Sequence, residues 1–254
     1  MMERLQFIKD YSVHVYETGP DGRITLHALC NFFQDIASDH AERLGFGKED
    51  LLRENQFWVL SRLAVEIYQW PEWGTDLSVR TWTRGTDRIF SLRDFEITSG
   101  DGNRIAAASS SWLMLDLETK KIRRPGTLIT RFNSDEEPEA ILGRNAAKIE
   151  AEGESLIAGK KHKVTISELD VNLHVNNVAY IKWATDAYGL DFRLSHRPVS
   201  AEINYIAESR LDDEIAVKTA AADPVGTSFI HSVSRTGDKT ELCRIKIGWK
   251  DCSQ

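Results

Sequence analysis

The stretch NVAYIKWATDAYGL, residues 177–190, is apolar on almost every side when it is wound as a helix. A surface helix keeps one polar face, so a helix that is apolar all round belongs inside a fold. The chain that follows supplies the cover. It contains four segments in which apolar and polar residues alternate with a period of two, as in half-buried strands: AEINYI (201–206), EIAVKTA (214–220), SFIHSVSR (228–235) and ELCRIKIGWK (241–250). We therefore predict an antiparallel sheet that curls around this helix.

The same order of elements occurs once before in the chain. LHALCNFFQDIASDHAERLG, residues 26–45, has apolar residues at helical spacing, and Gly45 suits a helix C-terminus. Four period-2 segments follow it: RLAVEI (62–67), LSVRTWT (77–83), IFSLRDFEIT (89–98) and IAAASSSWLMLDL (105–117). Each half also begins with a predicted short strand, YSVHVYE (11–17) or HKVTISELD (162–170). The predicted fold class is α+β, with two repeats in tandem, each an antiparallel sheet wrapped around a long helix.

A charged, helix-prone stretch separates the two repeats. It covers residues 133–160 and includes NSDEEPEAILGRNAAKIEAEGES. We interpret it as a linker with some helix, because its charge density suits a solvated segment better than a third core. This interpretation gives an N-terminal domain at residues 1–132 and a C-terminal domain at residues 161–254.

Composition argues against several classes of protein. Hydrophobic residues make up 41% of the chain and charged residues 28%, which is ordinary for a globular protein. No stretch approaches the roughly 18 consecutive apolar residues of a membrane span. The start, MMERLQFIKDY, has no apolar core of a secretory signal, and the net charge of −7 argues against a nucleic-acid partner. Cys30, Cys243 and Cys252 lack metal-ligand spacing, so we predict reduced thiols, a cytoplasmic protein, and no metal or other cofactor.

The segment just before the buried helix, DVNLHVN (170–176), is unusually polar. Polar side chains at the entrance to a buried element are costly unless they are paired. Asn176 suits the role of helix N-cap. Asp170, Asn172 and His174 need another explanation.

A comparison of the two halves suggests that explanation. Aligned by eye, the first half has Asp21, Arg23 and Thr25 where the second has Asp170, Asn172 and His174, and Glu208 falls near Tyr68. If an Asn, a His and a Glu were needed for the fold, both halves should carry them. Because only the second half does, we infer that they are functional.

Several stretches together resemble the acyl-ACP thioesterase family. They are DVNLHVNNVAYIKW (170–183), INYIAESRLDDEI (203–215) and, in the first half, ITLHALCNFFQDIASDHAERLG (24–45), WVLSRLAVEIYQWPEWGTDLSVRTW (58–82), RDFEI (93–97) and SSWLMLDLETKKIRRP (110–125). The resemblance runs from about residue 5 to residue 250. It implies a double hotdog fold and hydrolysis of fatty acyl-acyl carrier protein to free fatty acid, which ends chain elongation. It also implies a first half that selects acyl-chain length, a catalytic second half and acyl carrier protein as partner, and it leaves a homodimer open.

Residue by residue, the family's catalytic positions fall on Asp170, Asn172, His174 and Glu208. The next position is a cysteine in plant members and is Ser209 here, where we expect it to contact substrate. A serine nucleophile would need an activating base. We therefore favour direct attack by water.

Chemistry suggests a role for each group. A carboxylate can take a proton from water, and we favour Glu208 as this base, although the sequence does not decide between it and Asp170. Asp170 would then orient Asn172 or His174. His174 would donate to the oxyanion or to the leaving thiol. In an extended segment the side chains of Asn172 and His174 would point the same way, and the N–H groups near Asn176–Val178 would add oxyanion donors.

The remaining predictions concern substrate and partner. We expect the acyl chain to contact Phe32, Phe33, Ile36, Trp58 and Leu60, with Trp82 and Trp112 as further candidates. We interpret His27, His40 and His231 as structural. Acyl carrier protein is acidic, so docking needs local positive charge. Two clusters offer it: Lys120, Lys121, Arg123, Arg124 and Arg131; and Lys160, Lys161 and Lys163.

Three other functions stay open at this point. An acyl-CoA thioesterase would use the same chemistry with another carrier. A hotdog dehydratase would use His and a carboxylate to remove water from a 3-hydroxyacyl thioester. A non-catalytic acyl-binding protein would only hold the thioester. The sequence does not indicate the preferred chain length or saturation.

Overall fold

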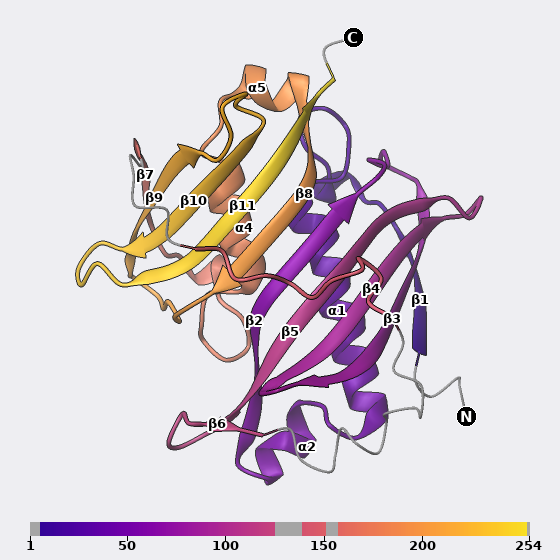
Figure 1. Cartoon of the computed structure of the whole chain (residues 1–254), viewed down its shortest axis with the longest axis vertical. Coiled ribbons are helices and arrows are strands. Elements are labelled where there is room, and N and C mark those ends of the chain that lie inside the picture. The colour runs from indigo at the N-terminus through magenta and orange to yellow at the C-terminus, as the bar shows by residue number, and fades with distance from the viewer. Residues whose placement is uncertain (1–5, 125–138, 151–156, 253–254) are drawn as a thin grey trace. The chain divides into compact units, whose positions relative to one another are not determined.

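The computed structural model describes residues 6–124, 139–150 and 157–252 of the chain. It divides into two compact units, Met1–Ala146 and Ala147–Gln254, here called unit 1 and unit 2. Figure 1 shows that each unit has a sheet with a helix against one of its faces. In the described ranges no helix is long and apolar enough to cross a membrane.

Unit 1 contains one long helix and an antiparallel sheet. The strands follow the order β1-β3-β4-β5-β2, and the short β6 pairs with the end of β5. Helix α1 contacts β1 and β3, and its buried face includes Leu29, Phe33 and Ile36. Gly45 ends α1 in the left-handed conformation (φ 76°), which confirms the predicted C-terminus. The elements are β1 (Gln6–Ser12), α1 (Leu26–Leu44), α2 (Lys48–Arg53), β2 (Gln56–Ile67), β3 (Asp76–Asp87), β4 (Phe90–Ser99), β5 (Arg104–Asp116) and β6 (Ile122–Arg123).

Unit 2 repeats this plan with a shorter helix. Its antiparallel strand order is β8-β11-β10-β9-β7, and α4 contacts β10 and β11. The buried residues of α4 include Tyr180, Ile181 and Trp183, as expected for a helix that is apolar all round. The elements are β7 (Ile157–Lys163), α4 (Asn177–Thr185), α5 (Leu190–Ser195), β8 (His196–Tyr205), β9 (Glu214–Ala221), β10 (Ser228–Arg235) and β11 (Glu241–Asp251).

The buried helix of unit 2 is shorter than predicted. It ends at Thr185, and a separate helix, α5, starts after Gly189. The turn between them places Tyr188 against Phe192 and Trp249, and the Trp249 indole N–H donates to the Tyr188 hydroxyl over 3.1 Å. An aromatic cluster therefore replaces the continued helix.

The short strand predicted at the start of each half is wrong in position. The strands lie earlier, in β1 and β7, and a 3-10 helix follows each, at Val15–Glu17 (η2) and Ile166–Glu168 (η3). Each 3-10 helix is closed by a capping box, in which Glu17 or Glu168 binds the backbone N–H three residues earlier. The T-x-x-E pattern at Thr165–Glu168 is a known signal for this motif and overrides the period-2 pattern.

The predicted helix in the linker is not found in residues 139–150, and β7 already begins at Ile157. Residues 147–149 instead run along β8 and β11. The Asn204 side chain accepts from the Ile149 N–H (2.7 Å) and donates to the Ala147 carbonyl (2.9 Å), while Arg244 donates to the Ile149 carbonyl (2.9 Å). These side chains take the place of helical hydrogen bonds.

Main-chain hydrogen bonds show which residues of the two units are equivalent. The isolated bridge Thr18–Ile24 of unit 1 matches Leu169–Val175 of unit 2. The Gly19 N–H donates to the Arg23 carbonyl over 2.8 Å, and the Asp170 N–H donates to the His174 carbonyl over 2.7 Å. Gly22 and Leu173, with φ of 74° and 62°, share the left-handed position in this loop.

The alignment by eye was therefore wrong by two residues. Gly19 matches Asp170, Asp21 matches Asn172, and Arg23 matches His174. The later loop shifts in the same way, since the Ile24 N–H donates to the Pro71 carbonyl (3.0 Å) and the Val175 N–H to the Ser209 carbonyl (2.9 Å). Trp70, and not Tyr68, is thus the equivalent of Glu208. Short turns lack the periodicity that fixes register in helices and strands, which explains the error.

Candidate active site

The first candidate loop, residues 169–175, is a tight turn and not the extended segment that we predicted. The bridge between Leu169 and Val175 closes it, and Leu173 turns the chain with φ 62°. Leu173 is 72% exposed, so it does not anchor the turn through burial. Asn172 and His174 therefore do not lie on one face of a strand.

The Asp170 carboxylate holds this loop in shape. One oxygen accepts from the N–H of Asn172 (2.8 Å) and from the N–H of His174 (3.2 Å). The other oxygen lies 3.5 Å from the side-chain amide of Asn172, which is exposed. Asp170 thus positions His174 through the main chain.

The second candidate loop follows β8 and carries Glu208. The Val175 N–H donates to the Ser209 carbonyl over 2.9 Å and joins the two loops. This contact places His174 Nε2 only 3.3 Å from Glu208 Oε2. The side chains are 25% and 42% exposed, so a substrate can reach both. The structure thus brings these two residues together, and their catalytic role stays a prediction.

Ser209 is completely buried beside this pair. Its hydroxyl donates to the Asp213 carboxylate over 2.8 Å. Burial alone would raise the pKa of Asp213, but hydrogen bonds from the Arg210 N–H and the Ser209 hydroxyl, together with Arg235, lower the pKa on balance. The ionised Asp213 carboxylate accepts a hydrogen bond from the buried Ser209 hydroxyl. This hydroxyl therefore points toward the carboxylate and not toward solvent.

The start of α4 supplies fewer free N–H groups than predicted. Asn176 is the N-cap, as expected, and its side-chain oxygen accepts from the Val178 N–H over 3.1 Å. The Asn176 N–H donates to the Glu168 carbonyl over 2.9 Å. The N–H of Asn177 is then the remaining candidate of the three for an oxyanion donor.

Two family models match this chain. The acyl-ACP thioesterase N-terminal domain matches residues 4–126, and the acyl-ACP thioesterase C-terminal domain matches residues 151–251. The chain belongs to the acyl-ACP thioesterase family. The two matches fall on units 1 and 2 respectively.

Individual acyl-ACP thioesterases resemble the chain over almost its whole length. Oleoyl-acyl carrier protein thioesterase 1 of Arabidopsis thaliana is 24% identical over 97% of this chain and 76% of its own length. Palmitoyl-acyl carrier protein thioesterase of Gossypium hirsutum is 26% identical over 98% of this chain and 65% of its own length.

Solved structures confirm the tandem hotdog fold. An acyl-ACP thioesterase from Bacteroides thetaiotaomicron aligns with a TM-score of 0.86 and 27% identity, and the alignment covers 98% of this chain and 99% of that one. The 12:0-ACP thioesterase of Umbellularia californica aligns with a TM-score of 0.81 and 21% identity over 97% of both chains, which supports the fold alone.

The acyl-contact candidates of this thioesterase are distributed over several parts of unit 1. Phe32 packs on Tyr11 and Phe33 on Phe95, while Ile36 is fully buried. Trp58 lies in another cluster with Phe46, Leu51 and Met114. Leu60 is 8% exposed, Trp82 is 7% exposed, and the Trp112 indole N–H donates to Ser110.

The predicted structural histidines all have hydrogen-bond partners in the described residues. His27 faces the Thr25 hydroxyl, and His40 lies 2.8 Å from the guanidinium of the buried Arg93. His231 is fully buried between the hydroxyls of Tyr188 and Thr219. Within residues 6–124, 139–150 and 157–252, no group of three or more His, Cys, Asp or Glu side chains could hold a metal ion.

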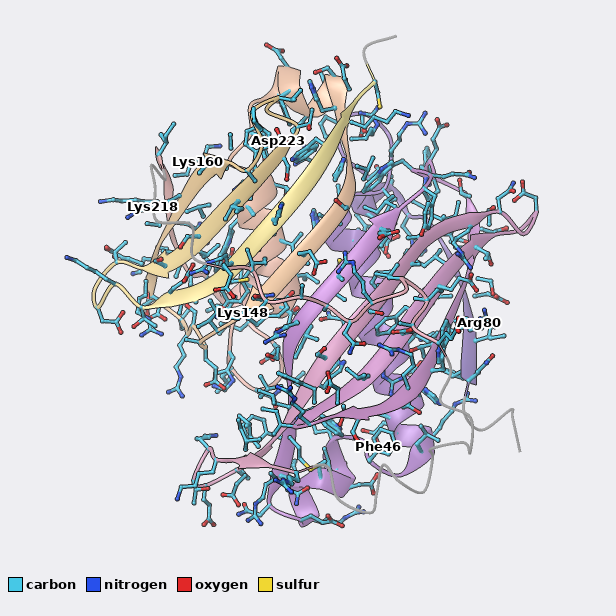
Figure 2. The ribbon with its side chains drawn as sticks, in the orientation of Figure 1. Phe46, Arg80, Lys148, Lys160, Lys218 and Asp223 are labelled. Carbon is cyan, nitrogen blue, oxygen red and sulfur yellow. The ribbon has the colours of Figure 1, made fainter. Side chains whose placement is uncertain are left out.

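The two basic clusters differ in how many of their charges are paired. Arg123 is bound to Asp116, and Lys120 lies over the Phe57 ring. Arg131 lies outside the described residues. In the second cluster, Lys163 pairs with Asp212 over 2.8 Å. Figure 2 shows Lys160 of this cluster on the same side of unit 2 as Lys218 of the neighbouring β9.

The sequence prediction missed Asp213 and Arg235, which lie behind Glu208 and Ser209. Arg235 donates to the Glu208 carbonyl over 2.7 Å and pairs with Asp213 over 3.0 Å. Neither residue belongs to a motif with a recognised spacing. A repeat alignment in the correct register would have found them, because unit 1 has Thr75 and Ser99 at the equivalent positions.

Proposed function

We propose that this chain hydrolyses the thioester of fatty acyl-acyl carrier protein and releases free fatty acid. The observation that carries the proposal is the 3.3 Å approach of His174 Nε2 to Glu208 Oε2, at an accessible place and in one repeat only. A histidine and a carboxylate in contact can together move a proton. Membership of the acyl-ACP thioesterase family supplies the substrate class.

In the proposed reaction, water attacks the thioester carbonyl carbon directly. Glu208 takes the proton of that water, and the carbonyl becomes a tetrahedral oxyanion. His174 and the N–H of Asn177 donate to this oxygen. When the carbon–sulfur bond breaks, the thiolate takes the proton that Glu208 removed from the water, so the products are a carboxylic acid and the thiol of the carrier protein, and Glu208 is again ionised.

Geometry supports Glu208 over Asp170 as the general base. One oxygen of Asp170 already accepts two main-chain N–H groups, and the other faces Asn172. A carboxylate that is occupied in this way holds a loop better than it accepts a proton. The Glu208 side chain is 42% exposed and lies next to His174, where water can enter.

The test is hydrolysis of acyl-ACP and acyl-CoA that carry the same acyl chain, followed as release of free thiol. We expect faster hydrolysis of acyl-ACP, and a loss of about 10³-fold in kcat for His174→Ala and for Glu208→Gln. His14→Ala is the matched control, because His14 Nδ1 lies 3.1 Å from Glu17 Oε2 in unit 1, a histidine–carboxylate contact outside the proposed catalytic pair. This variant should keep wild-type kcat.

Each rival function gives a different result in this assay. Faster hydrolysis of acyl-CoA would identify an acyl-CoA thioesterase. An enoyl product from a 3-hydroxyacyl thioester, without thiol release, would identify a dehydratase. Binding of acyl-ACP without turnover by the wild type would identify an acyl-binding protein and would reject the proposed hydrolysis.

The acyl chain, by this proposal, is selected in unit 1. Phe32, Phe33 and Ile36 are buried on α1, where an apolar chain could be enclosed. We expect Ile36→Phe to shift activity toward shorter acyl chains, with Phe57→Leu as a control on the face that carries Lys120. An unchanged chain-length profile for alanine variants at Phe32, Phe33, Ile36, Trp58 and Leu60 would reject this part.

The acidic carrier protein, by this proposal, docks on one of the two basic clusters. In the first, Arg123 is engaged by Asp116, so we expect Arg124→Glu to raise KM for acyl-ACP more than Arg123→Glu. In the second, Lys161→Glu is the equivalent test. An unchanged KM after charge reversal removes that cluster from the docking surface.

A cytoplasmic location is also part of the proposal. It is supported by free thiols at Cys30, Cys243 and Cys252. Burial raises the pKa of the Cys30 thiol to about 12, so this thiol is unreactive at neutral pH. Its side chain is part of the hydrophobic core. Localisation of a tagged chain in its own cell tests this statement.

A further inference from the structure

The main-chain carbonyl of Glu208 accepts a hydrogen bond from Arg235, the last residue of β10. Arg235 donates to the Glu208 carbonyl over 2.7 Å and to the Asp213 carboxylate over 3.0 Å. A third bond, of 2.9 Å, joins it to Asp238. The Arg235 side chain is 27% exposed, and charge-assisted hydrogen bonds of this kind are stronger than neutral ones.

Asp213 connects this arginine to the rest of the loop. The oxygen that binds Arg235 also accepts from the Ser209 hydroxyl (2.8 Å) and the Arg210 N–H (3.0 Å). The Ser209 carbonyl in turn accepts from the Val175 N–H, next to His174. A continuous set of hydrogen bonds therefore runs from Arg235 to the main chain of Glu208 and to Val175, the residue next to His174.

Unit 1 builds the same main-chain frame without this charged set. Its residues at the positions of Ser209, Asp213 and Arg235 are Pro71, Thr75 and Ser99. These three residues line an open surface depression of about 490 Å³, together with Arg23 and Trp70. The fold alone therefore does not require the partly buried Asp213–Arg235 pair at this place.

The Glu208 carbonyl of unit 2 and the equivalent Trp70 carbonyl of unit 1 each accept from an arginine, but the two arginines lie on different elements. In unit 1, Arg23 donates to the Trp70 carbonyl over 2.7 Å, and Arg23 is the equivalent of His174. In unit 2 the bond comes from β10 instead. The position on the substrate side is thereby left for His174, which faces the Glu208 carboxylate.

We propose that Arg235, with Asp213 and Ser209, positions the general base Glu208 against His174. This inference rests on the proposed hydrolysis. Arg235 touches no reacting atom, and it acts by fixing the main chain from which the Glu208 side chain projects. A displacement of about 1 Å in a reacting group can lower a rate about 100-fold, so such an anchor matters for kcat.

The test is a double-mutant cycle with steady-state kinetics on acyl-ACP. We expect Arg235→Met to lower kcat 10- to 100-fold, the loss for a displacement of about 1 Å or less. KM should change about twofold or less. Arg235→Lys should restore part of the lost kcat. In the Glu208→Gln background, Arg235→Met should lower kcat about twofold or less, because the group it positions is gone.

Arg23→Met is the matched control. It removes an arginine bond of the same 2.7 Å length to the equivalent carbonyl, in the unit without the catalytic pair. It should leave kcat at the wild-type value. Ser209→Ala is a milder second variant in case Arg235→Met does not fold, and we expect a 3- to 10-fold loss of kcat from it, less than the roughly 100-fold of a fully misplaced group.

Three outcomes would overturn the inference: an unchanged kcat in both Arg235→Met and Ser209→Ala, an equal loss in the Arg235→Met and Arg23→Met variants, or the same fold-loss from Arg235→Met with and without Glu208. A wild type that hydrolyses no acyl-ACP contradicts the proposed function itself. An active wild type with an unaffected Arg235→Met variant contradicts only the positioning role.

Discussion

Units 1 and 2 share a loop frame but carry different side chains on it. Both close the loop with the same bridge, the same hydrogen bond across it and a left-handed residue, Gly22 or Leu173. Unit 1 places Arg23 and a tryptophan where unit 2 places His174 and Glu208. The frame is thus set by main-chain bonds, and the proposed chemistry comes from a few side chains that the frame does not require.

The largest expected effect comes from exchanging the side chain at the matched position. His174→Arg gives unit 2 the residue that unit 1 carries there, so the frame should accept it. We expect kcat on acyl-ACP to fall by about 10³-fold, because a permanently charged arginine beside Glu208 would hold its carboxylate as an ion pair and weaken it as a base toward water. Thermal unfolding measured alongside should show a Tm close to that of the wild type.

The reverse exchange, Arg23→His, should add no activity, because Trp70 offers no carboxylate. Activity of the double variant His174→Arg, Arg23→His can be measured in the same assay. Recovery of hydrolysis in this double variant would mean that the frame of unit 1 already contains a working site, and the contrast between the units would fail.

A smaller effect is expected at a buried pair of equivalent positions, Phe95 in β4 and His231 in β10. Both face a threonine on the neighbouring strand, Thr81 or Thr219. Burial lowers the pKa of His231 to about 4. In the unfolded chain the pKa of a histidine is about 6.5, so the unfolded state binds the proton first as the pH falls.

The stability that depends on neutral His231 is therefore complete above pH 6.5 and is lost as the pH falls toward 4. Between pH 7.5 and 5 we expect the wild type to lose about 2 kcal/mol more unfolding free energy than His231→Phe. Urea unfolding of both proteins at several pH values measures this difference. Parallel pH profiles would show that His231 does not titrate on unfolding.

Regular elements could be predicted from the sequence, and the turns could not. The period-2 segments of β2–β5 and β8–β11 and the C-terminus of α1 lie where the pattern placed them, because periodicity and capping are local signals. The split between α4 and α5 depends on packing of Tyr188 against Trp249, a contact between residues far apart in the chain. No local pattern encodes such a contact.

The candidate site was predictable in its residues and not in its geometry. Asp170, His174 and Glu208 stood out because of their chemistry, and the structure places all three on two joined loops. Their register against unit 1 was wrong by two positions, because turns carry no period. Arg235 was missed because a lone arginine on a strand is an ordinary surface residue until its partners are known.

The loop carboxylate offers the next comparison, between Asp170 and Asp21. Asp170 accepts two main-chain N–H groups, whereas Asp21 accepts the N–H of Arg23 over 3.3 Å. We expect Asp170→Ala to lower the unfolding free energy by about 1.5 kcal/mol and Asp21→Ala by less than about 1 kcal/mol. Only Asp170→Ala should also lower kcat, because it loosens the main chain of His174. Equal losses of stability, with kcat unchanged in both, would remove Asp170 from the site.

The smallest expected effect concerns the left-handed residue of each loop. Leu173 holds φ 62° and is mostly exposed, whereas Gly22 holds φ 74° and a Cβ there would meet nothing within 4 Å. A non-glycine residue in this conformation costs about 1 kcal/mol. Gly22→Leu should therefore destabilise the protein by about 1 kcal/mol, and Leu173→Gly should stabilise it by up to about 1 kcal/mol.

Chemical denaturation of both variants measures these changes, and the kinetics of Leu173→Gly separate strain from function. If Leu173 only tolerates its strain, kcat on acyl-ACP stays at the wild-type value while stability rises. A lower kcat with higher stability would instead show that the strained, exposed leucine contributes to the substrate side of the loop, next to His174. The strained Leu173 in unit 2, where unit 1 has the unstrained Gly22, would then be one of the side-chain differences that make only unit 2 catalytic.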